Sequence, residues 1–400
     1  MTAVSWLHSN ATGVTGGMPV TPEFRTPLTV IREYASLLCD DVLGQLKAEQ
    51  CRLLHVITDR SDELNNMVNN MLDSSRLNMG ILSVDRCACE AADIVRQVEE
   101  SLQRKAVLRD VSIEFHIAPE LPTVYCDSEK AARILTNLTI NAIKFSGDPG
   151  QVVVRVYQAA PGEDVAISVA DNGPGIAKDE QQIIFDRFRQ IGTSTRSSTQ
   201  GFGLGLSIVH ELVGANFGQL EVASESGNGS MFSFTLPLHQ PAEIARRYTD
   251  RLAHKSTDPA RVSVISASLT ETDAACGNMK GFWQRIQRGR DLALQVRHDC
   301  WLYLVACGEV EVTNVVDRIN RERNEANRNR AQAPLAELNL KHEGTWWAKA
   351  GRDAFNHCLE QLCETGASLK SPADHSTTAG ILPVSTPSSA CSNRQITAPA

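Results

Sequence analysis

The sequence predicts a multidomain α+β protein in which a helical hairpin precedes two α/β units. The chain has 400 residues, which is too many for one hydrophobic core. Its first part repeats apolar residues at helical spacing, and the rest mixes alternating strand patterns with amphipathic helices. We expect a loose N-terminus (1–20), a dimerisation hairpin (21–84), an α/β sandwich (85–240), a linker (241–260), a βαββαβ domain (261–366) and a disordered tail (367–400).

The composition is that of an ordinary globular protein, with 42% apolar and 22% charged residues. A net charge of −8 argues against a nucleic-acid partner. We find no apolar run long enough to cross a bilayer, and the first twenty residues do not read as a signal peptide. Eleven cysteines without metal-type spacing favour reduced thiols in a cytoplasmic protein over disulfides or zinc.

The hairpin is predicted from two amphipathic stretches that are separated by a break near Gly44. Apolar residues keep a three–four spacing in both stretches, at Leu28, Ile31, Ala35 and Leu38, and then at Leu53, Ile57, Leu64, Val68 and Met71. A lone hairpin cannot bury both stripes. We therefore expect two copies to form a dimeric four-helix bundle.

Both α/β units are predicted from alternating strands and helical periodicity. In the sandwich we expect strands at 111–117, 151–158, 165–171, 218–225 and 231–238, and helices at 128–146 and 205–217. Short loops between neighbouring strands indicate an antiparallel or mixed sheet with helices on one face. In the C-terminal unit we expect strands at 262–269, 292–298, 301–308 and 335–342, and helices at 281–290, 311–330 and 353–364.

The first chemically suggestive stretch is a helix segment with two carboxamides. Asn137 and Asn141 lie one turn apart on the same face, and Lys144 and Phe145 follow one turn later. Amide oxygens could bind a hard cation such as Mg²⁺, with Lys144 near phosphates. Taken alone, the pair fits an ordinary solvated helix face slightly better.

The second stretch is a tight Asp-Asn-Gly-Pro-Gly-Ile turn after a strand. Gly173 and Gly175 allow the backbone to approach a ligand closely. The Asp171 carboxylate only accepts hydrogen bonds, so it could receive the amino group of adenine. An ordinary loop is the alternative, and so specific a string favours function.

Two further stretches complete the pattern. Residues 185–190 carry two phenylalanines three positions apart, as in a short helix that packs on the core and anchors a lid. Gly201, Gly203 and Gly205 precede an amphipathic helix and would present bare N–H groups to an anion. The small polar residues before them suit a mobile lid.

In this order and spacing, the four stretches resemble the asparagine, glycine, phenylalanine and second glycine boxes of the two-component sensor histidine kinases. The resemblance extends from residue 21 to residue 238 and includes their GHKL-type ATPase domain, which Hsp90, DNA gyrase and MutL share. It implies that Asn141 coordinates Mg²⁺ on the phosphates of ATP and that Asn137 lies on the same face. It also implies that Lys144 reaches a phosphate and that Phe145 borders the nucleotide.

The resemblance implies roles for the glycine boxes as well. Asp171 would read the adenine amino group in a pocket shaped by Gly173 and Gly175. The three glycines of the second box would flank the phosphates beneath the lid, namely Gly201, Gly203 and Gly205.

The hairpin also resembles the dimerisation and phosphotransfer module of this family. Residues 23–28 match the end of its histidine box, H-E-L-R-T-P-L, which makes Pro27 the expected bend of the first helix. Pro22 stands where the phosphoacceptor histidine belongs. Proline has no nucleophilic side chain, so autophosphorylation there is chemically impossible. Glu23 occupies the position of the general base, with nothing beside it to deprotonate.

No other residue near the hairpin matches the acceptor motif. His8 and His55 lie outside it and are interpreted as ordinary polar residues. Thr21 is a neighbouring hydroxyl, but its phosphorylation would be different chemistry.

The C-terminal unit faintly resembles the diguanylate-cyclase-like domains. Their Gly-Gly-acidic-acidic-Phe hairpin should lie between the two middle strands, where this chain has a lone Asp299. We therefore expect a binding or docking role rather than cyclisation. An unrelated α/β domain is a nearly equal alternative.

Three functions remain open. The chain could be a cytoplasmic, homodimeric, ATP-dependent histidine kinase that passes phosphate to the receiver domain of a response regulator. It could instead be an ATP-binding pseudokinase that regulates another kinase or a response regulator. The match at residues 23–28 makes a different ATPase of the superfamily the least favoured reading.

Overall fold

The computed structural model of the chain describes both α/β units and much of the hairpin. The described residues are 22–39, 46–47, 49–54, 56–58, 60–61, 64–65, 68–69, 84–187, 189, 203, 205–255, 260–270, 276–288, 291–328, 330, 334–348 and 352–364. At residues 22–25, 255, 276–278, 352 and 364 only the backbone is described. The expected loose N-terminus and disordered tail lie outside these residues, as do Thr21, Gly44, His55 and Met71.

The hairpin begins with helix α2, Pro22–Cys39, which contains Pro27 in its interior. Pro22 is the first helical residue, a position at which the missing N–H has no intrahelical partner anyway. The described residues between 49 and 69 are helical too. The predicted helical character of both segments is thus confirmed where the structure describes them.

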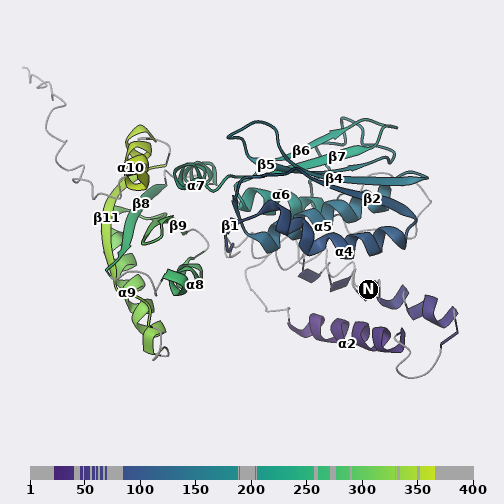
Figure 1. The fold of residues 1–400 in the computed structure, drawn as a ribbon, viewed down its shortest axis with the longest axis horizontal. Helices are drawn as coiled ribbons and strands as arrows, with labels where there is room; N and C mark the ends of the chain where they lie inside the picture. Colours follow the sequence, from purple (N-terminus) through teal and green to yellow (C-terminus); the bar gives the residue numbers. More distant parts are fainter. Residues whose placement is uncertain are drawn as a thin grey trace, which may run out of the picture.

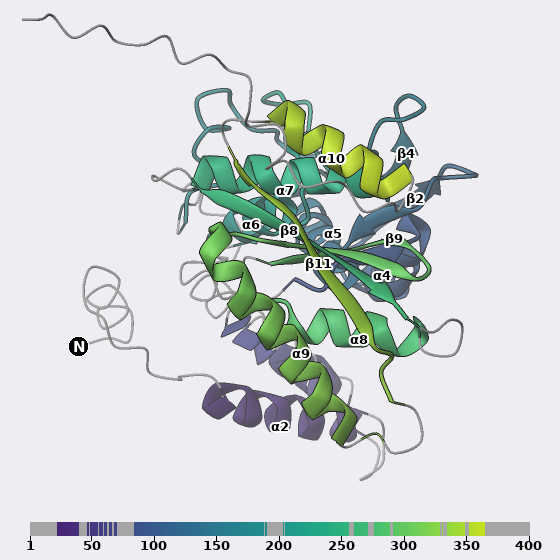
Figure 2. The same ribbon diagram turned by 90° about the vertical axis from the view of Figure 1, so that its left-hand side faces the viewer.

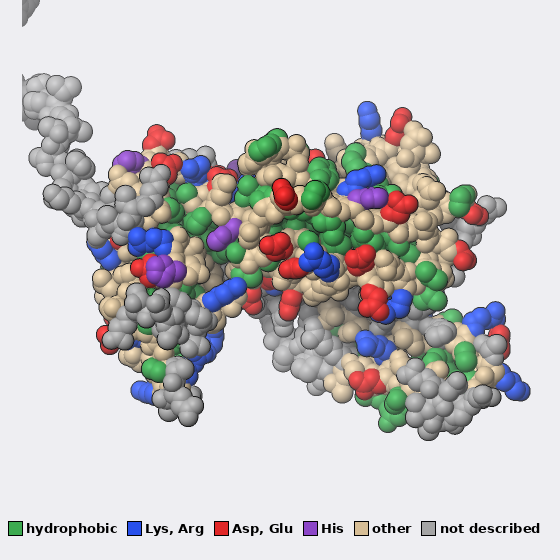
Figure 3. Space-filling view, viewed as in Figure 1, with side chains coloured by type: hydrophobic (Ala, Val, Ile, Leu, Met, Phe, Trp, Pro, Cys, Tyr) green, Lys and Arg blue, Asp and Glu red, His purple; other side chains and the backbone are tan. Residues whose placement is uncertain are grey.

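Apolar side chains of the hairpin remain exposed in the single chain. Ala35 is buried, but eight larger apolar residues are between 42% and 65% exposed, namely Val30, Ile31, Tyr34, Leu37, Leu53, Val56, Ile57 and Leu64. Hydrophobic side chains are visible on the surface of this region at the lower right of Figure 3. So many exposed apolar side chains on two neighbouring helices are typical of an interaction surface.

The middle unit is a five-stranded sheet with helices on one face (Figure 1). Its order is β2-β4-β5-β7-β6, and β2 runs parallel to β4 while the other neighbours are antiparallel. The strands are β2 (Val111–Ile117), β4 (Gly150–Gln158), β5 (Val165–Asp171), β6 (Leu220–Ser224) and β7 (Ser230–Leu236). The helices are α4 (Ala91–Val107), α5 (Ser128–Phe145) and α6 (Gly205–Ala215).

This arrangement confirms the predicted mixed sheet with one-sided helices. Three elements were not predicted from the sequence: α4, and the two short strands β1 (Cys87–Cys89) and β3 (Val124–Cys126), which pair antiparallel. Helix α4 buries Ile94, Val95 and Leu102, a helical spacing that was present in the sequence.

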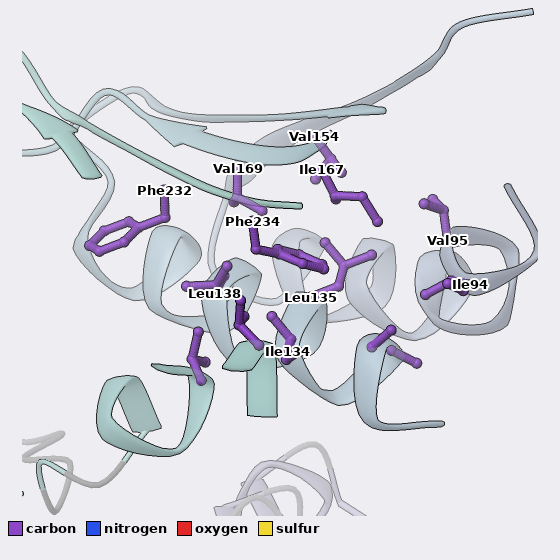
Figure 4. Packing of buried hydrophobic residues seen from close by; sticks show 14 of the residues in the cluster. Ile94, Val95, Ile134, Leu135, Leu138, Val154, Ile167, Val169, Phe232 and Phe234 are labelled. Atoms are coloured by element: carbon purple, nitrogen blue, oxygen red, sulfur yellow. The ribbon is translucent and has the colours of Figure 1, made fainter. Parts of the chain in front are cut away.

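The core of the unit lies between α5 and the sheet (Figure 4). Ile134, Leu135 and Leu138 of α5 are at most 1% exposed. Leu135 and Leu138 point toward the strands, from which Val154, Ile167, Val169 and Phe234 enter the same cluster. Full burial of each such side chain contributes roughly 1.5–3 kcal/mol, so α5 is held firmly in place.

The C-terminal unit is a four-stranded antiparallel sheet in the order β11-β8-β10-β9. Its strands are β8 (Arg261–Leu269), β9 (Leu292–Arg297), β10 (Cys300–Val305) and β11 (Leu338–Trp347). Helices α8 (Cys276–Ile286) and α9 (Val312–Arg328) complete a βαββαβ order, and α10 (Arg352–Glu364) follows. The predicted split-βαβ arrangement is confirmed.

Where the sequence suggested a linker at 241–260, the structure has helix α7, Pro241–Lys255. Many charged residues gave this segment a polar composition. Its few apolar residues nevertheless fall on one face, and Ile244, Ala245 and Tyr248 are buried. Helices α7 and α10 pack on one face of the four-stranded sheet, and α8 and α9 pack on the other (Figure 2).

The two α/β units are packed against each other. Tyr125 of β3 and Phe217, just after α6, belong to the same buried cluster as Ile244 of α7. The Tyr125 hydroxyl donates a hydrogen bond to the carbonyl of Ala293 on β9 at 3.2 Å. Strand β3 therefore contacts both α/β units.

A bidentate ion pair fastens α7 to the sandwich. Arg247 of α7 donates from Nη1 and Nη2 to the two carboxylate oxygens of Asp164 at 2.7 and 2.9 Å. Its Nη1 also donates to the carbonyl of Phe217.

None of the helices in the described part of the chain has the length and apolar character needed to span a membrane.

Candidate functional site

Helix α5 supplies the first part of the candidate site. It begins after Asp127, whose carboxylate accepts a hydrogen bond from the backbone N–H of Lys130 at 3.0 Å and so caps the helix. Because α5 turns its apolar face to the sheet, Asn137 and Asn141 lie half-buried along its edge. The buried Nδ2 of Asn137 has no hydrogen-bond partner among the described residues. An unpaired buried donor costs about 1–3 kcal/mol, which a ligand or water could recover.

Helix α6 meets α5 at Asn141. A Cβ atom placed on Gly205, the first residue of α6, would lie 3.9 Å from Nδ2 of Asn141. The backbone N–H groups at the start of α6 therefore lie beside this amide. A helix N-terminus favours anions. Gly203 has φ +66°, in the left-handed region that glycine tolerates best. Gly201 and the predicted lid lie outside the described residues.

The Asp171 turn supplies the third part. One carboxylate oxygen of Asp171 accepts a hydrogen bond from the N–H of Gly173 at 2.9 Å. Partial burial raises the pKa of Asp171, and the N–H groups of Gly173 and Ser230 partly oppose this shift. The carboxylate is therefore partly desolvated, as expected for a group that recognises a ligand.

The two glycines of the turn serve close contacts within the protein. A Cβ on Gly173 would lie 2.1 Å from the Phe145 carbonyl oxygen, at the end of α5. Gly175 has φ +69°, and a Cβ there would lie 1.9 Å from the Glu225 carbonyl oxygen. The sequence suggested that the backbone at these glycines lies close to a ligand, whereas in the structure it lies close to the backbone carbonyls of Phe145 and Glu225. The glycines thus hold the Asp171 turn against α5 and the β6–β7 hairpin.

Asn172 has a structural role that sequence reasoning missed. Its Oδ1 accepts hydrogen bonds from the N–H groups of Gly147 and Gln151 at 3.1 and 2.9 Å, and its Nδ2 donates to the Pro149 carbonyl at 2.7 Å. The side chain thereby fastens the loop between α5 and β4. The available signal was an asparagine in a glycine-rich turn, where such side chains commonly bond to nearby backbone.

The end of α5 also positions Lys144 and Phe145. The Lys144 ammonium lies 5.0 Å from the centroid of the Phe145 ring, which is 52% exposed. Both side chains follow Asn141 on the same helix, next to the Gly173 contact. The structure therefore brings together Asn141, Lys144, Phe145, Gly205 and the Asp171 turn.

The phenylalanine segment is attached to α6. Of the short helix predicted at 185–190, the structure describes residues 185–187 and 189, and residues 185–187 form turns and a bend. The ring centroids of Phe185 and His210 are 5.9 Å apart, and Arg187 pairs with Glu211. Phe185 also packs against the buried cluster of the unit, as expected. Pro22 and Glu23 lie in the first turn of α2, where only the backbone is described.

Comparisons with known proteins assign both modules. Residues 126–240 match the family "Histidine kinase-, DNA gyrase B-, and HSP90-like ATPase", and residues 21–80 match the "His Kinase A (phospho-acceptor) domain". The fold and site thus define a GHKL-type ATPase domain preceded by a phospho-acceptor-type helical module. Both matched modules, within residues 21–240, are those of the two-component sensor histidine kinases.

Individual relatives match little more than half of the chain. It is 35% identical to the adaptive-response sensory kinase SasA of Parasynechococcus marenigrum, over 55% of this chain and 56% of that protein. It is 29% identical to the alginate biosynthesis sensor protein KinB of Pseudomonas aeruginosa, over 54% of this chain and 35% of that protein. A crystal structure of full-length ShkA in complex with AMPPNP is 33% identical, with a TM-score of 0.43, over 55% of this chain and 46% of that one. The chain thus spans about half or less of the length of these proteins.

Proposed function

We propose that the chain is a histidine-kinase-type signalling protein that binds ATP with Mg²⁺ between α5, α6 and the Asp171 turn. The observation that carries this proposal is the approach of Asn141 to Gly205 at the start of α6. It sets the side-chain amide of Asn141, whose oxygen is a ligand suited to Mg²⁺, beside a helix N-terminus suited to phosphate. A metal–triphosphate complex needs both partners at once.

The remaining residues complete the proposed site. The Nδ2 of Asn137, which has no partner in the described part of the chain, supports a polar ligand on this face of α5. Lys144 would reach a phosphate, and the exposed ring of Phe145 would border the nucleotide. The partly desolvated carboxylate of Asp171 would accept the adenine amino group. The second glycine box would flank the phosphates, through Gly201, Gly203 and Gly205.

Calorimetric titration with a nonhydrolysable ATP analogue and Mg²⁺ tests the site. We expect Asn141→Ala and Asp171→Ala each to weaken binding by about tenfold or more, because each removes a bond to a charged or partly desolvated group. The matched control is Asn314→Ala on the exposed face of α9, which should bind like the wild type. Equal affinity in all four proteins would remove the basis for the site.

For phosphotransfer, we propose a homodimer that works with the receiver domain of a response regulator. The exposed apolar residues of the hairpin and the match of residues 21–80 to a phospho-acceptor domain support the pairing. The hairpin would supply the surface that a receiver domain meets.

A second candidate function is that of an ATP-binding regulatory module without self-phosphorylation. Pro22 favours it, because proline offers no atom that could attack the terminal phosphate. Glu23 follows it, at the position where the family resemblance places the general base. Such a protein would act by binding another kinase or a response regulator.

Incubation with γ-labelled ATP and Mg²⁺ separates the two candidates. We expect no acid-labile label on the wild type and a gain of label in Pro22→His, with Pro22→Ala as the unreactive control. Acid-labile label on the wild type would show that another residue is the acceptor. Failure of Pro22→His to gain label, with ATP still bound, would show that more than the acceptor has been lost.

A further inference from the structure

Two cysteine side chains meet where the chain enters the ATPase domain. The sulfur atoms of Cys89 on β1 and Cys126 on β3 lie 3.4 Å apart. In the antiparallel pairing of these strands, Cys87 is opposite Cys126 and Cys89 is opposite Val124. Cys89 is therefore the diagonal neighbour of Cys126 on the same face of the pair. Both are free thiols.

The contact is close to the geometry of a disulfide. A disulfide has a sulfur–sulfur distance of about 2.05 Å, so the two atoms need to approach by roughly 1.4 Å. Diagonal positions have Cα atoms further apart than a relaxed disulfide prefers, so the strands must shift slightly. Strand β1 has only three residues and, among the described strands, pairs with β3 alone, which makes such a shift easy.

The two thiols differ in exposure and acidity. Cys126 is fully buried, whereas Cys89 is partly exposed. The hydrogen bond between them lowers the pKa of Cys89 and, together with burial, raises the pKa of Cys126. Cys89 thus ionises more readily, and the thiolate is the form that attacks an oxidant.

We propose that Cys89 and Cys126 form a reversible disulfide when the protein meets a hydroperoxide. The Cys89 thiolate attacks the peroxide, the O–O bond breaks, and Cys89 becomes a sulfenic acid while an alkoxide or hydroxide leaves. The Cys126 sulfur then attacks the Cys89 sulfur, and the sulfenic hydroxyl leaves as water with the Cys126 proton. The two thiols together lose two electrons, which the peroxide accepts.

The position of the pair gives the bond a mechanical consequence. Residues 84–90 join the hairpin to the ATPase domain, and noncovalent contacts already hold them. The Asp85 N–H donates to the Asp127 carboxylate at 2.9 Å, and the Arg86 guanidinium donates twice to the Ala215 carbonyl, at 2.8 and 2.6 Å. Cys126 immediately precedes Asp127, which caps α5. The disulfide would therefore tie this junction covalently to the start of the helix that carries Asn137 and Asn141.

The test uses the full chain treated with hydrogen peroxide, then alkylated, digested and mapped by mass spectrometry. We expect a peptide pair joined through Cys89 and Cys126 that disappears after reduction. Cys89→Ser should lose the pair completely. Cys87→Ser is the matched control, because Cys87 lies directly opposite Cys126 in the same strands, and it should retain the pair. In the oxidised wild type, amide hydrogen exchange at residues 85–89 should be slower than in the reduced protein.

A third variant, Cys126→Ala, removes the thiol that would react with the sulfenic acid. In Cys126→Ala, a sulfenic acid on Cys89 should be trapped by dimedone more strongly than in the wild type, because no thiol resolves it. If Cys126→Ala does not fold, the comparison of Cys89→Ser with Cys87→Ser decides alone. Two results would overturn the proposal: absence of the Cys89–Cys126 pair in the oxidised wild type, or formation of a crosslink between Cys87 and Cys126 in its place.

Discussion

Gly175 offers a sharp test of how the Asp171 turn is held, because the chain contains a matched control. Gly175 and Gly162 both adopt positive φ, +69° and +86°. A Cβ on Gly175 would lie 1.9 Å from the Glu225 carbonyl oxygen, whereas a Cβ on Gly162 would meet nothing within 4 Å. Alanine at either position bears the left-handed penalty of about 1–2 kcal/mol. Only Gly175→Ala adds an overpacked contact.

Relieving that contact should cost about 1–3 kcal/mol more, a typical figure for overpacking. Two amides report on it directly: Gly227 donates to the Pro174 carbonyl at 2.7 Å, and Ile176 donates to the Ser224 hydroxyl at 2.8 Å. If these bonds open with the turn, their hydrogen exchange should be roughly 5- to 150-fold faster in Gly175→Ala than in Gly162→Ala. NMR-detected exchange measures this ratio. Equal protection of both amides in the two variants would refute the reasoning.

Two further predictions concern charge. Burial raises the pKa of Asp171, so the native state binds its proton more tightly than the unfolded chain does. As the pH falls through this pKa, the free energy of unfolding should therefore rise slightly, whereas nucleotide affinity should fall because the protonated group loses acceptor capacity. Unfolding and binding titrations of wild type and Asp171→Asn across pH measure both effects. A parallel response of the two proteins would contradict the assignment. The partly buried Arg247–Asp164 pair should show a coupling free energy of about 1–2 kcal/mol in a double-mutant cycle of Arg247→Ala and Asp164→Ala, measured by chemical unfolding, and a value near zero would mean that the two units are not held together there.

The elements predicted well are those with a strong local pattern. Strands β2 and β4 alternate less exposed and more exposed residues over at least seven positions, and α5 combines a capping aspartate with apolar periodicity. Strands β1 and β3 have three residues each, too few to show a period. They exist because residues distant in sequence pair with each other. No window of local sequence records such pairing.

Helix α7 and the glycines show a second kind of limit. Helix α7 is rich in charged residues, so its composition resembles a linker, and its burial depends on the sheet that it covers. The spacing of Ile244 and Tyr248 was the readable signal. For Gly173 and Gly175 the motif located the turn correctly. The absence of a side chain at each glycine makes room for the backbone carbonyls of Phe145 and Glu225. This role depends on tertiary packing, which local sequence does not show.

The packing of Tyr125 and Arg247 between the two units has a practical consequence for spectroscopy. Four of the five tryptophans lie in the C-terminal unit, at Trp283, Trp301, Trp346 and Trp347, and residues 85–240 contain none. Indole emission from these residues therefore originates outside the proposed nucleotide pocket. A nucleotide-dependent change in their emission would require a structural change that is transmitted through β3 and α7. Tryptophan fluorescence of the unlabelled protein would therefore report coupling between the two α/β units.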